Sequence, residues 1–527
     1  MKNNKGITLV ALVVTIIILL ILAGISIQML SGNNGILTRA KEAKEQMEDA
    51  QDLEVLNMKI LESSLDDGTP NINTLIPQLQ EMGCTVSGES YPLSVELKGK
   101  NYQIDSEGTL KNVGSTEELT KEENYLIVME SSKSKFEGKT NVGTMEEFKN
   151  LVNSGTFDYT TAILYENIEL NCSETNTWTP IGTETNKFAK VLDGRNYSIN
   201  GLYANSSNIG QGLFGDNTGT IQNVTVNGTI NCNADAVGGI VAGNEGIVEN
   251  CVSNVTITGK DHVGGIAGYN TATGTIRNCI SNKNITGTQV VGGIVGASDG
   301  NITECSNYGD IKSTSTEEST LANSDNIYGT GGITGVESWG TISNSRNLGK
   351  IEGVSNCIGG IAGTSFGANI KSCYNDGEIS GDKCGVGGIV GFQKYQIASI
   401  SYCYNKNKIS GASNLGGIVG DIYAGNVTNC YNVGIVEDGV DWEIQNKGGI
   451  CGGNSEGNNS EIGITNCYTL DNLNLNVAGA ELENVVDTLS KKETEINMKS
   501  DAFVETINAG ESNFKKGKGY PLLNWQK

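Results

Sequence analysis

One stretch of the chain decides the fold: Gly264-Gly-Ile-Ala-Gly268, then Gly274-Thr-Ile-Arg-Asn-Cys279, then Ile285-Thr-Gly287. Each of these three runs alternates apolar and polar residues and contains a glycine suited to a turn. That pattern is typical of short β-strands that bury one face. We therefore predict three short strands in a unit of about 28 residues.

The same unit recurs along the chain. The second glycines of successive Gly-Gly-Ile copies are 26, 28, 39, 28, 28, 29 and 32 residues apart, and a degenerate copy occupies Gln211–Gly215. One unit cannot bury its own apolar face, so stacked units must close a common core. We predict a mainly β protein with a parallel β-helix, or solenoid. The eight copies begin at Gly238, Gly264, Gly292, Gly331, Gly359, Gly387, Gly416 and Gly448.

Composition agrees with an ordered solenoid. The chain has 70 glycines but five prolines, and none lies between Pro180 and Pro521, as expected where a proline would remove a ladder hydrogen bond. The net charge of −24 argues against a sequence-independent nucleic-acid binder, which needs a basic face. A single histidine, His262, excludes two-histidine metal sites.

The 13 cysteines show no CxxC spacing, and many share one position in the repeat. Stacked turns lie about 4.8 Å apart, so these side chains should form an inward column. They could bind metal or form disulfides, or they could be small buried thiols that fill a narrow corner. We favour buried thiols and expect no metal or cofactor, since no second ligand column accompanies them. The column comprises Cys251, Cys279, Cys305, Cys373, Cys403, Cys430 and Cys467, with Ser345 replacing cysteine once.

Asparagine recurs two residues beyond this column. Asparagine tolerates left-handed turns and can hydrogen-bond to a stacked copy of itself, so we interpret these residues as a corner ladder. They are Asn307, Asn347, Asn375, Asn405 and Asn432.

The N-terminus carries a membrane-like segment. Residues 1–6 include two lysines, and Ile7–Leu30 contains no charge over 24 residues. At about 1.5 Å per residue this helix would cross a hydrocarbon core of about 30 Å. The preceding lysines favour a cytoplasmic N-terminus, so we predict a single-pass protein of the cell membrane with its bulk outside. The alternative is a cleaved secretory signal.

The following region mixes helix and strand patterns. Apolar residues spaced by three and four predict an amphipathic helix over Leu37–Leu65. Leu93–Leu97 and Asn101–Ile104 predict a hairpin, so residues 31–112 form a helix and a small domain. Residues 113–141 are polar and predict a linker.

Both ends of the solenoid need caps, because open rungs would pair with other chains. Thr144-Met-Glu-Glu147 is a capping box that predicts a helix ending near Gly155. We assign residues 142–202 to this cap and to entry rungs, and residues 471–527 to the C-terminal cap. A helix over Ser500–Ala509 should cover that end.

Candidate ligand contacts lie in the later units. Two long units should form loops, one at Ser313–Thr320 and one that includes Glu437, Asp438 and Trp442. Trp442 among carboxylates could contact a sugar or hold Ca²⁺, although such a residue more often covers an apolar edge. By alternation, an aromatic column points outward, where it could stack on glycan rings or form a stabilising ladder, and we favour the ladder. The column comprises Tyr374, Tyr404, Tyr431 and Tyr468.

Residues Lys5–Leu12 resemble the prepilin signature of type IV pilins and pseudopilins. The resemblance implies cleavage by a prepilin peptidase between Gly6 and Ile7, which leaves the membrane segment in the mature protein. Ala11 stands where that family usually has glutamate, a residue linked to filament assembly. A membrane-resident protein or a minor tip subunit of a pilus-like assembly therefore both fit.

The repeats over residues 203–470 resemble the GLUG-motif repeats of bacterial surface proteins, which include adhesin-like proteins and some IgA-cleaving metalloproteases. Residues 191–201 resemble their entry rungs, and 519–525 their closing strand. The resemblance implies an extracellular adhesin-like or structural module, with a host or matrix glycan or protein as partner. The alternative is a polysaccharide-active enzyme, but acidic residues are scattered through the repeat and do not align in register, so we expect a non-enzymatic protein.

Overall fold

The structure is a computed structural model of the chain. It describes residues 55–60, 63, 70–88, 91–98, 100–105, 108, 110–115, 125–130, 141–315, 328–354, 357–439, 446–454, 461–479, 482 and 485–526. The chain divides into two compact units, residues 1–121 and 122–527. Each unit is described by itself.

The first unit contains a small antiparallel sheet with the order β1-β2-β3-β4. Helix α3 (Ile72–Glu81) begins where the Asn71 side chain accepts a hydrogen bond from the backbone N–H of Asn73. Leu56 and Ile60, on the apolar face of the predicted amphipathic helix, are buried in this unit's core. The predicted hairpin is confirmed as β2 and β3, and the sheet runs on to Ser115. The strands are β1 (Thr85–Ser87), β2 (Leu93–Leu97), β3 (Lys100–Ile104) and β4 (Leu110–Ser115).

The predicted membrane segment Ile7–Leu30 and the processing residues Gly6 and Ile7 lie outside the described residues. In the part of the chain that the structure does describe, no helix is long and apolar enough to span a membrane.

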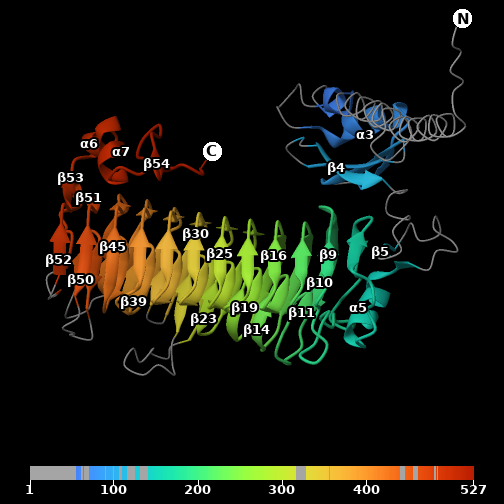
Figure 1. The fold of residues 1–527 in the computed structure, drawn as a ribbon, viewed down its shortest axis with the longest axis horizontal. Helices are drawn as coiled ribbons and strands as arrows, with labels where there is room; N and C mark the ends of the chain where they lie inside the picture. The colour runs from blue at the N-terminus through green and yellow to red at the C-terminus, as the bar shows by residue number, and fades with distance from the viewer. Residues whose placement is uncertain are drawn as a thin grey trace, which may run out of the picture. The chain divides into compact units, whose positions relative to one another are not determined.

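The second unit is a parallel β-solenoid in which successive turns stack along one axis (Figure 1). It begins earlier than predicted, because Tyr125–Val128 pairs with the next turn although it falls in the expected linker. The segments on both sides of Tyr125–Val128 are rich in polar residues, so the sequence does not reveal this strand, whose last three residues are buried. The longest sheet, counted in turns rather than in strands, contains β6 (Val142–Gly143), β5 (Tyr125–Val128), β7 (Thr161–Leu164), β9 (Val191–Asp193), β12 (Thr220–Gln222), β16 (Ile247–Glu249), β20 (Thr275–Arg277), β25 (Asn301–Thr303), β30 (Thr341–Ser343), β35 (Asn369–Lys371), β40 (Ser399–Ser401), β45 (Gly425–Thr428), β50 (Ile462–Thr465) and β52 (Val485–Thr488).

Two further sheets lie on either side of the Gly-Gly pairs. One contains β14 (Asp235–Gly238), β18 (Asp261–Gly264), β23 (Val290–Gly292), β28 (Gly329–Gly331), β33 (Ile358–Gly359), β38 (Cys384–Gly387), β43 (Ser413–Gly416) and β48 (Lys447–Gly448). The other contains β11 (Phe214–Asn217), β15 (Val241–Asn244), β19 (Ala267–Asn270), β24 (Val295–Ser298), β29 (Thr334–Ser338), β34 (Ala362–Phe366), β39 (Val390–Lys394), β44 (Val419–Ile422) and β49 (Cys451–Gly453). We call them the 14-series and the 11-series, after their first strands.

The last sheet starts with β8 (Ile168–Glu169) and long strands, and continues as pairs of short strands in each turn. It contains β10 (Ser198–Ala204), β13 (Thr225–Asn231), β17 (Val252–Thr258), β21 (Ile280–Ser281), β22 (Ile285–Gly287), β26 (Ser306–Asn307), β27 (Ile311–Ser313), β31 (Arg346–Asn347), β32 (Ile351–Gly353), β36 (Tyr374–Asn375), β37 (Ile379–Gly381), β41 (Tyr404–Asn405), β42 (Ile409–Gly411), β46 (Tyr431–Asn432), β47 (Val436–Asp438), β51 (Tyr468–Leu470) and β53 (Lys491–Glu493).

The expected three strands per unit are a simplification, because the run around Gly264 spans two sheets. β18 ends at Gly264 and β19 starts at Ala267, so Gly265 and Ile266 form a bend between them. A Cβ on Gly264 would lie 2.0 Å from the carbonyl oxygen of Ala267, and one on Gly265 would lie 2.2 Å from Oγ of Ser281. Real Cβ atoms do not approach so closely, which explains why the bend requires two glycines.

The cysteine column is confirmed as a line of buried thiols, and its seven cysteines are not joined in disulfides. Each thiol donates a hydrogen bond to the carbonyl two residues earlier, for example Cys430 Sγ to Thr428 O at 3.1 Å. Ser345 repeats this contact at 2.8 Å. The residue before each column position is left-handed, as at Asn429 with φ 53° and Asn278 with φ 48°. The column is therefore a corner element.

The asparagine ladder is also confirmed. Asn307 Nδ2 donates to Asn347 Oδ1 at 2.8 Å, and the bonds continue through Asn375 and Asn405 to Asn432 at 2.8 to 2.9 Å. These residues lie in short strands rather than in left-handed turns. At this corner, the left-handed positions belong to the residues that precede the cysteine column.

The two predicted cap helices form, but the second one lies elsewhere than expected. α5 (Met145–Asn153) starts with the capping box at Thr144. The solenoid continues through β52 and β53 beyond the predicted end at residue 470. α6 (Glu495–Met498), α7 (Asp501–Asn508) and the hairpin of β54 (Phe514–Lys515) with β55 (Leu522–Leu523) then pack on the side of the last turns, against the tyrosines. Residues 519–525 are therefore not a closing strand.

We predict that Ile266→Asp lowers the free energy of unfolding by several kcal/mol, because Ile266 is fully buried at the bend and an unpaired carboxylate would be buried there. Thermal melts of the full chain measure the change. Ile247→Asp is the control, since that side chain is 37% exposed on strand β16. Equal melting shifts for both variants would contradict the inward orientation of Ile266.

We predict that Cys430→Ser keeps the fold at a cost of about 1 kcal/mol or less, because serine can donate the same bond that Ser345 donates. Melting curves test the stability. Thiol titration of the unfolded, unreduced protein tests the column itself. Column cysteines that do not react, because they are paired in disulfides, would refute the buried-thiol interpretation.

Candidate functional site

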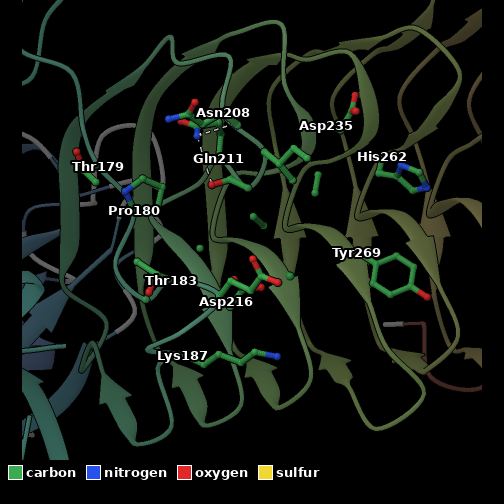
Figure 2. Close-up of a pocket in the computed structure, with 18 of the residues that line it drawn as sticks. Thr179, Pro180, Thr183, Lys187, Asn208, Gln211, Asp216, Asp235, His262 and Tyr269 are labelled. Atoms are coloured by element: carbon green, nitrogen blue, oxygen red, sulfur yellow. Dashed lines mark hydrogen bonds between the residues drawn. The ribbon is translucent and has the colours of Figure 1, made fainter. Parts of the chain in front are cut away.

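A groove of about 870 Å³ lies along the line where the 11-series and 14-series sheets meet in the first turns (Figure 2). Its floor comes from the outer faces of β11, β15 and β19 and from the corners beside β14 and β18. The connections that precede these strands close it, with residues from Thr179 to Lys187 and from Asn208 to Gln211. The walls are hydrogen-bonded turns, so the groove is already formed without a ligand.

The groove exists because Gly243 leaves a gap between Asp216 and Tyr269 in an outward column. In the 11-series sheet, register aligns Asp216, Gly243, Tyr269, Ala297 and Val336 in successive turns. The first three positions border the groove, whereas Ala297 and Val336 are buried in an apolar cluster that fills the same line farther along. The recess is therefore confined to the first turns.

The start of the 14-series strands contributes the other part of the floor, beside the 11-series strands. Gly210, Ala236 and His262 occupy equivalent positions there, and all three have positive φ, at 84°, 58° and 50°. Asp261 supports this conformation, because its Oδ1 accepts from the backbone N–H of His262 at 2.9 Å and of Val290 at 3.1 Å. The Asp261 carboxylate therefore already accepts hydrogen bonds from the backbone.

The groove is acidic. Glu184, Asp216, Asp235 and Asp261 line it together with one lysine, Lys187. In Figure 2 the Asp216 carboxylate lies at the centre of the labelled side chains, between Thr183 and the 14-series corner. A ligand with positive charge would be attracted to this surface.

Lys187 offsets the acidic floor only in part, because its ammonium group donates to the Glu245 carboxylate. That hydrogen bond raises the pKa of Lys187. Burial raises the pKa of the Asp216 carboxyl; Lys187 opposes this shift, while Glu245 and Glu184 add to it. Asp216 is thus the half-buried carboxylate of the site that would gain from a cationic partner.

Two other side chains shape the rim. The Tyr269 hydroxyl donates to Asp299, and burial and this bond raise the pKa of Tyr269, so the ring is held at the far wall as a neutral phenol. Ile209 is 77% exposed at the near wall. The groove therefore combines a central carboxylate with apolar surface on both sides.

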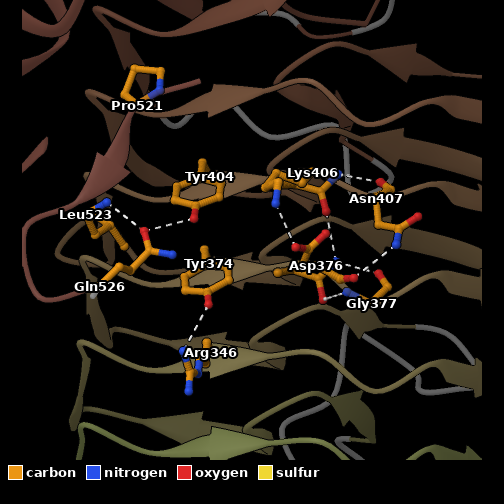
Figure 3. A network of polar contacts seen from close by, with 12 residues as sticks. Arg346, Tyr374, Asp376, Gly377, Tyr404, Lys406, Asn407, Pro521, Leu523 and Gln526 are labelled. Atoms are coloured by element: carbon orange, nitrogen blue, oxygen red, sulfur yellow. Dashed lines mark hydrogen bonds and ion pairs between the residues drawn. The ribbon is translucent and has the colours of Figure 1, made fainter. Parts of the chain in front are cut away.

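The four tyrosines predicted as ligand contacts are buried. Tyr374 stacks on Tyr404 at 4.9 Å and Tyr404 on Tyr431 at 4.8 Å, with nearly parallel rings. The C-terminal segment covers them, and the Tyr404 hydroxyl donates to Gln526 at 2.9 Å (Figure 3). The column does point outward from the turns, but in this structure it offers no face to a ligand and forms an internal ladder instead.

The network continues at the N-terminal side of the column. Arg346 lies at the equivalent position one turn earlier, and its guanidinium donates to the Tyr374 hydroxyl at 3.3 Å (Figure 3). Trp525 Nε1 donates to the carbonyl of Ser372 at 2.9 Å. The last residues of the chain thus fasten the C-terminal segment across several turns.

The other predicted contacts are only partly covered. Trp442 and most of the Ser313–Thr320 loop lie outside the described residues. Glu437 and Asp438 belong to strand β47 rather than to a loop, and they pair with Lys408 and Lys447. Within the described residues, no cluster of three His, Cys, Asp or Glu side chains could hold a metal ion.

Sequence reasoning did not find the groove, because missing side chains create it. Asp216, Gly243 and Tyr269 differ chemically, and their equivalence appears only once the register of the turns is known. An alignment of the repeats would have placed Asp216 and Gly243 in one column with the apolar residues Ala297 and Val336. This change along the column is the signal that the sequence offers.

Comparison with known proteins supports the repeat assignment. The family model of the GLUG motif matches residues 261–286, which is one turn. No curated protein matches the chain.

Two solved structures are similar at low identity. One is a "putative immunoglobulin A1 protease" from Bacteroides ovatus, with 16% identity, a TM-score of 0.30, and coverage of 70% of this chain and 86% of that one. The other is described as an IgA1 protease, with 14% identity, a TM-score of 0.26, and coverage of 72% of this chain but 25% of that one. At these values neither similarity bears on the function of this chain, which is a β-solenoid with a GLUG motif.

Proposed function

We propose that this chain is a membrane-anchored, adhesin-like binding module of the cell surface. The solenoid serves as a rigid support, and the groove around Asp216 is its ligand site. The observation that carries the proposal is the preformed acidic groove, whose walls are fixed by backbone hydrogen bonds. Preformed walls lower the ordering cost of binding.

The chemistry of the groove favours an extended protein segment that carries a lysine or arginine. The cation would lie beside Asp216, and the apolar stem of the same side chain would contact Ile209 and Tyr269. A long basic side chain combines both features, whereas an anionic glycan would be repelled by the surrounding carboxylates. A matrix or host protein is therefore the favoured partner.

A binding role is favoured over a polysaccharide-active enzyme. Hydrolysis of a glycosidic bond uses two carboxyl groups that face one bond. Here Asp261 is engaged by backbone N–H groups, and Asp235 lies 3.3 Å from the Lys260 ammonium. This arrangement supports a role in holding a ligand rather than in moving protons.

The anchor is proposed from the sequence. Residues 7–30 would hold the protein in the cell membrane with its N-terminus in the cytoplasm, after a prepilin peptidase cleaves between Gly6 and Ile7. Residues 122–527 would then be displayed outside, where a rigid rod suits contact with a surface.

We predict that Gly243→Val lowers the affinity for lysine- or arginine-bearing peptides by about tenfold or more. Valine suits a strand, and the nearest atom to the new Cβ is Asp216 Oδ1 at 2.8 Å, the movable end of a side chain. The groove therefore fills while the fold remains. Binding of the full chain to an array of synthetic peptides graded from neutral to basic measures the effect.

Thr256→Val is the matched control, because it adds valine at an exposed strand position of β17. Asp216→Asn should weaken basic peptides without closing the groove. Affinity should also fall as the pH drops through the raised pKa of Asp216, since the protonated carboxyl loses its charge. Equal binding by wild type and Gly243→Val, or a preference for neutral peptides, would refute the assignment.

We predict that Gly6→Leu blocks N-terminal processing but not membrane insertion, because insertion depends on the apolar segment and its lysines. N-terminal sequencing of the protein from the membrane fraction should find Ile7 first in the wild type. A mature start beyond Ser26 would indicate an ordinary secretory signal and remove the anchor from the proposal.

A further inference from the structure

A second surface feature lies away from the groove, at the corners that connect the 11-series strands to the longest sheet. Three large apolar side chains are exposed there: Trp339 at 60%, Tyr395 at 40% and Ile397 at 67%. Trp339 follows β29, and Tyr395 and Ile397 follow β39 two turns later. We call Trp339, Gly367, Tyr395 and Ile397 the aromatic corner.

The two rings occupy the same structural position. Register pairs Ser338 with Phe366 and Phe366 with Lys394, so Trp339, Gly367 and Tyr395 are equivalent in three successive turns. All three have positive φ, at 62°, 68° and 77°. Glycine adopts this conformation without penalty, whereas a bulky aromatic residue there is strained by about 1–3 kcal/mol.

Gly367 makes room for the tryptophan. A Cβ at position 367 would lie 2.6 Å from two carbon atoms of the Trp339 ring, so the ring lies directly over this glycine. The Trp339 and Tyr395 rings stack with centroids 5.1 Å apart and planes inclined by 24°. A ring that is stacked on one side and still 60% exposed must offer its other face to solvent.

These features do not stabilise the fold in an obvious way. Two aromatic residues adopt a backbone conformation that suits glycine, and together with Ile397 they expose apolar surface to water. Other left-handed corners of the chain use asparagine, as at Asn278 and Asn429. Strain combined with exposed apolar surface is typical of a binding site.

We propose that the aromatic corner binds a neutral, β-linked oligosaccharide of glucose configuration, with one pyranose ring stacked on the free face of Trp339. In such a sugar the hydroxyl groups are equatorial, so both ring faces carry axial C–H groups of slight positive charge. These faces complement the negative face of an indole. Tyr395 holds the indole in place before the sugar arrives, which reduces the ordering cost of binding.

The surroundings favour a sugar over an apolar peptide. The corner is an exposed surface rather than a pocket, and peptide anchors bind most strongly in pockets. Asn369 is exposed in the turn between the two rings, and the Ser399 hydroxyl donates to its Oδ1 at 3.0 Å. Amide and hydroxyl groups beside a flat ring suit the hydroxyl groups of a sugar. The net charge of −24 disfavours anionic glycans.

Trp339→Asn tests the proposal, because asparagine tolerates the left-handed backbone while it removes the ring. Isothermal titration of the full chain with cellohexaose and with chitohexaose should show binding that weakens by about tenfold or more in this variant. Its melting temperature should stay equal or rise, since the strain is relieved. A purely structural ring would instead lower the melting temperature.

Leu489→Asn is the matched control. Leu489 is also apolar, 76% exposed and left-handed, with φ 64°, but it lies at a different corner. This variant should bind both sugars as the wild type does. Lack of binding of either sugar to the wild type at millimolar concentration, or equal affinities for wild type and Trp339→Asn, would overturn the proposal. Because the groove variant Gly243→Val leaves this corner intact, the two sites can fail or succeed independently.

Discussion

The structure depends on parallel backbone hydrogen bonds between one turn and the next. These bonds fix the spacing of the turns at about 4.8 Å and hold equivalent residues directly above one another. Each position of the repeat therefore becomes a column, and a side chain must fit its own copies as well as its turn. The thiols of Cys403 and Cys430, the amides of Asn375 and Asn405, and the rings of Tyr404 and Tyr431 follow this constraint. In each case identical groups pack at the spacing that the backbone sets.

The same constraint explains the Gly-Gly pair. The first glycine lies against a carbonyl of its own turn, and the second faces the polar ladder across the narrow interior. A Cβ on Gly388 would lie 2.6 Å from Cβ of Asn405, and one on Gly360 would lie 2.6 Å from Cβ of Asn375. The glycines and the asparagines are thus two sides of one close contact. The second glycine is kept in every copy, whereas its polar partner varies: it is Ser281 opposite Gly265 and Thr469 opposite Gly449.

This coupling determines how much could be predicted from the sequence. Column residues recur, so the solenoid, the buried thiols and the asparagine ladder were all predictable from spacing. The predicted end of the solenoid was wrong, because β52 and β53 continue the turns after the Gly-Gly motif stops. The stabilising ladder favoured for Tyr404 and Tyr431 is found, but the segment that covers it could not be predicted. Alternation places their rings outside the turns, but it cannot show that a later segment with Phe503 and Phe514 packs over them. The groove escaped prediction because Gly243 creates it by the absence of a side chain.

Candidate binding surfaces in such a fold are best sought where a column is interrupted. A column filled by matching residues buries its own side chains and leaves no space for a ligand. At Gly243 the interruption is a missing side chain, and the result is a groove. At Trp339 and Tyr395 the interruption is an oversized pair around Gly367, and the result is an exposed ring. The tyrosine column shows the opposite case: its rings also stack at turn spacing, but the C-terminal segment covers them, and the hydroxyls of Tyr404 and Tyr431 donate to that segment. Stacking alone therefore does not mark a binding surface. What distinguishes the aromatic corner is that its rings stay exposed in a backbone conformation that glycine would adopt without strain.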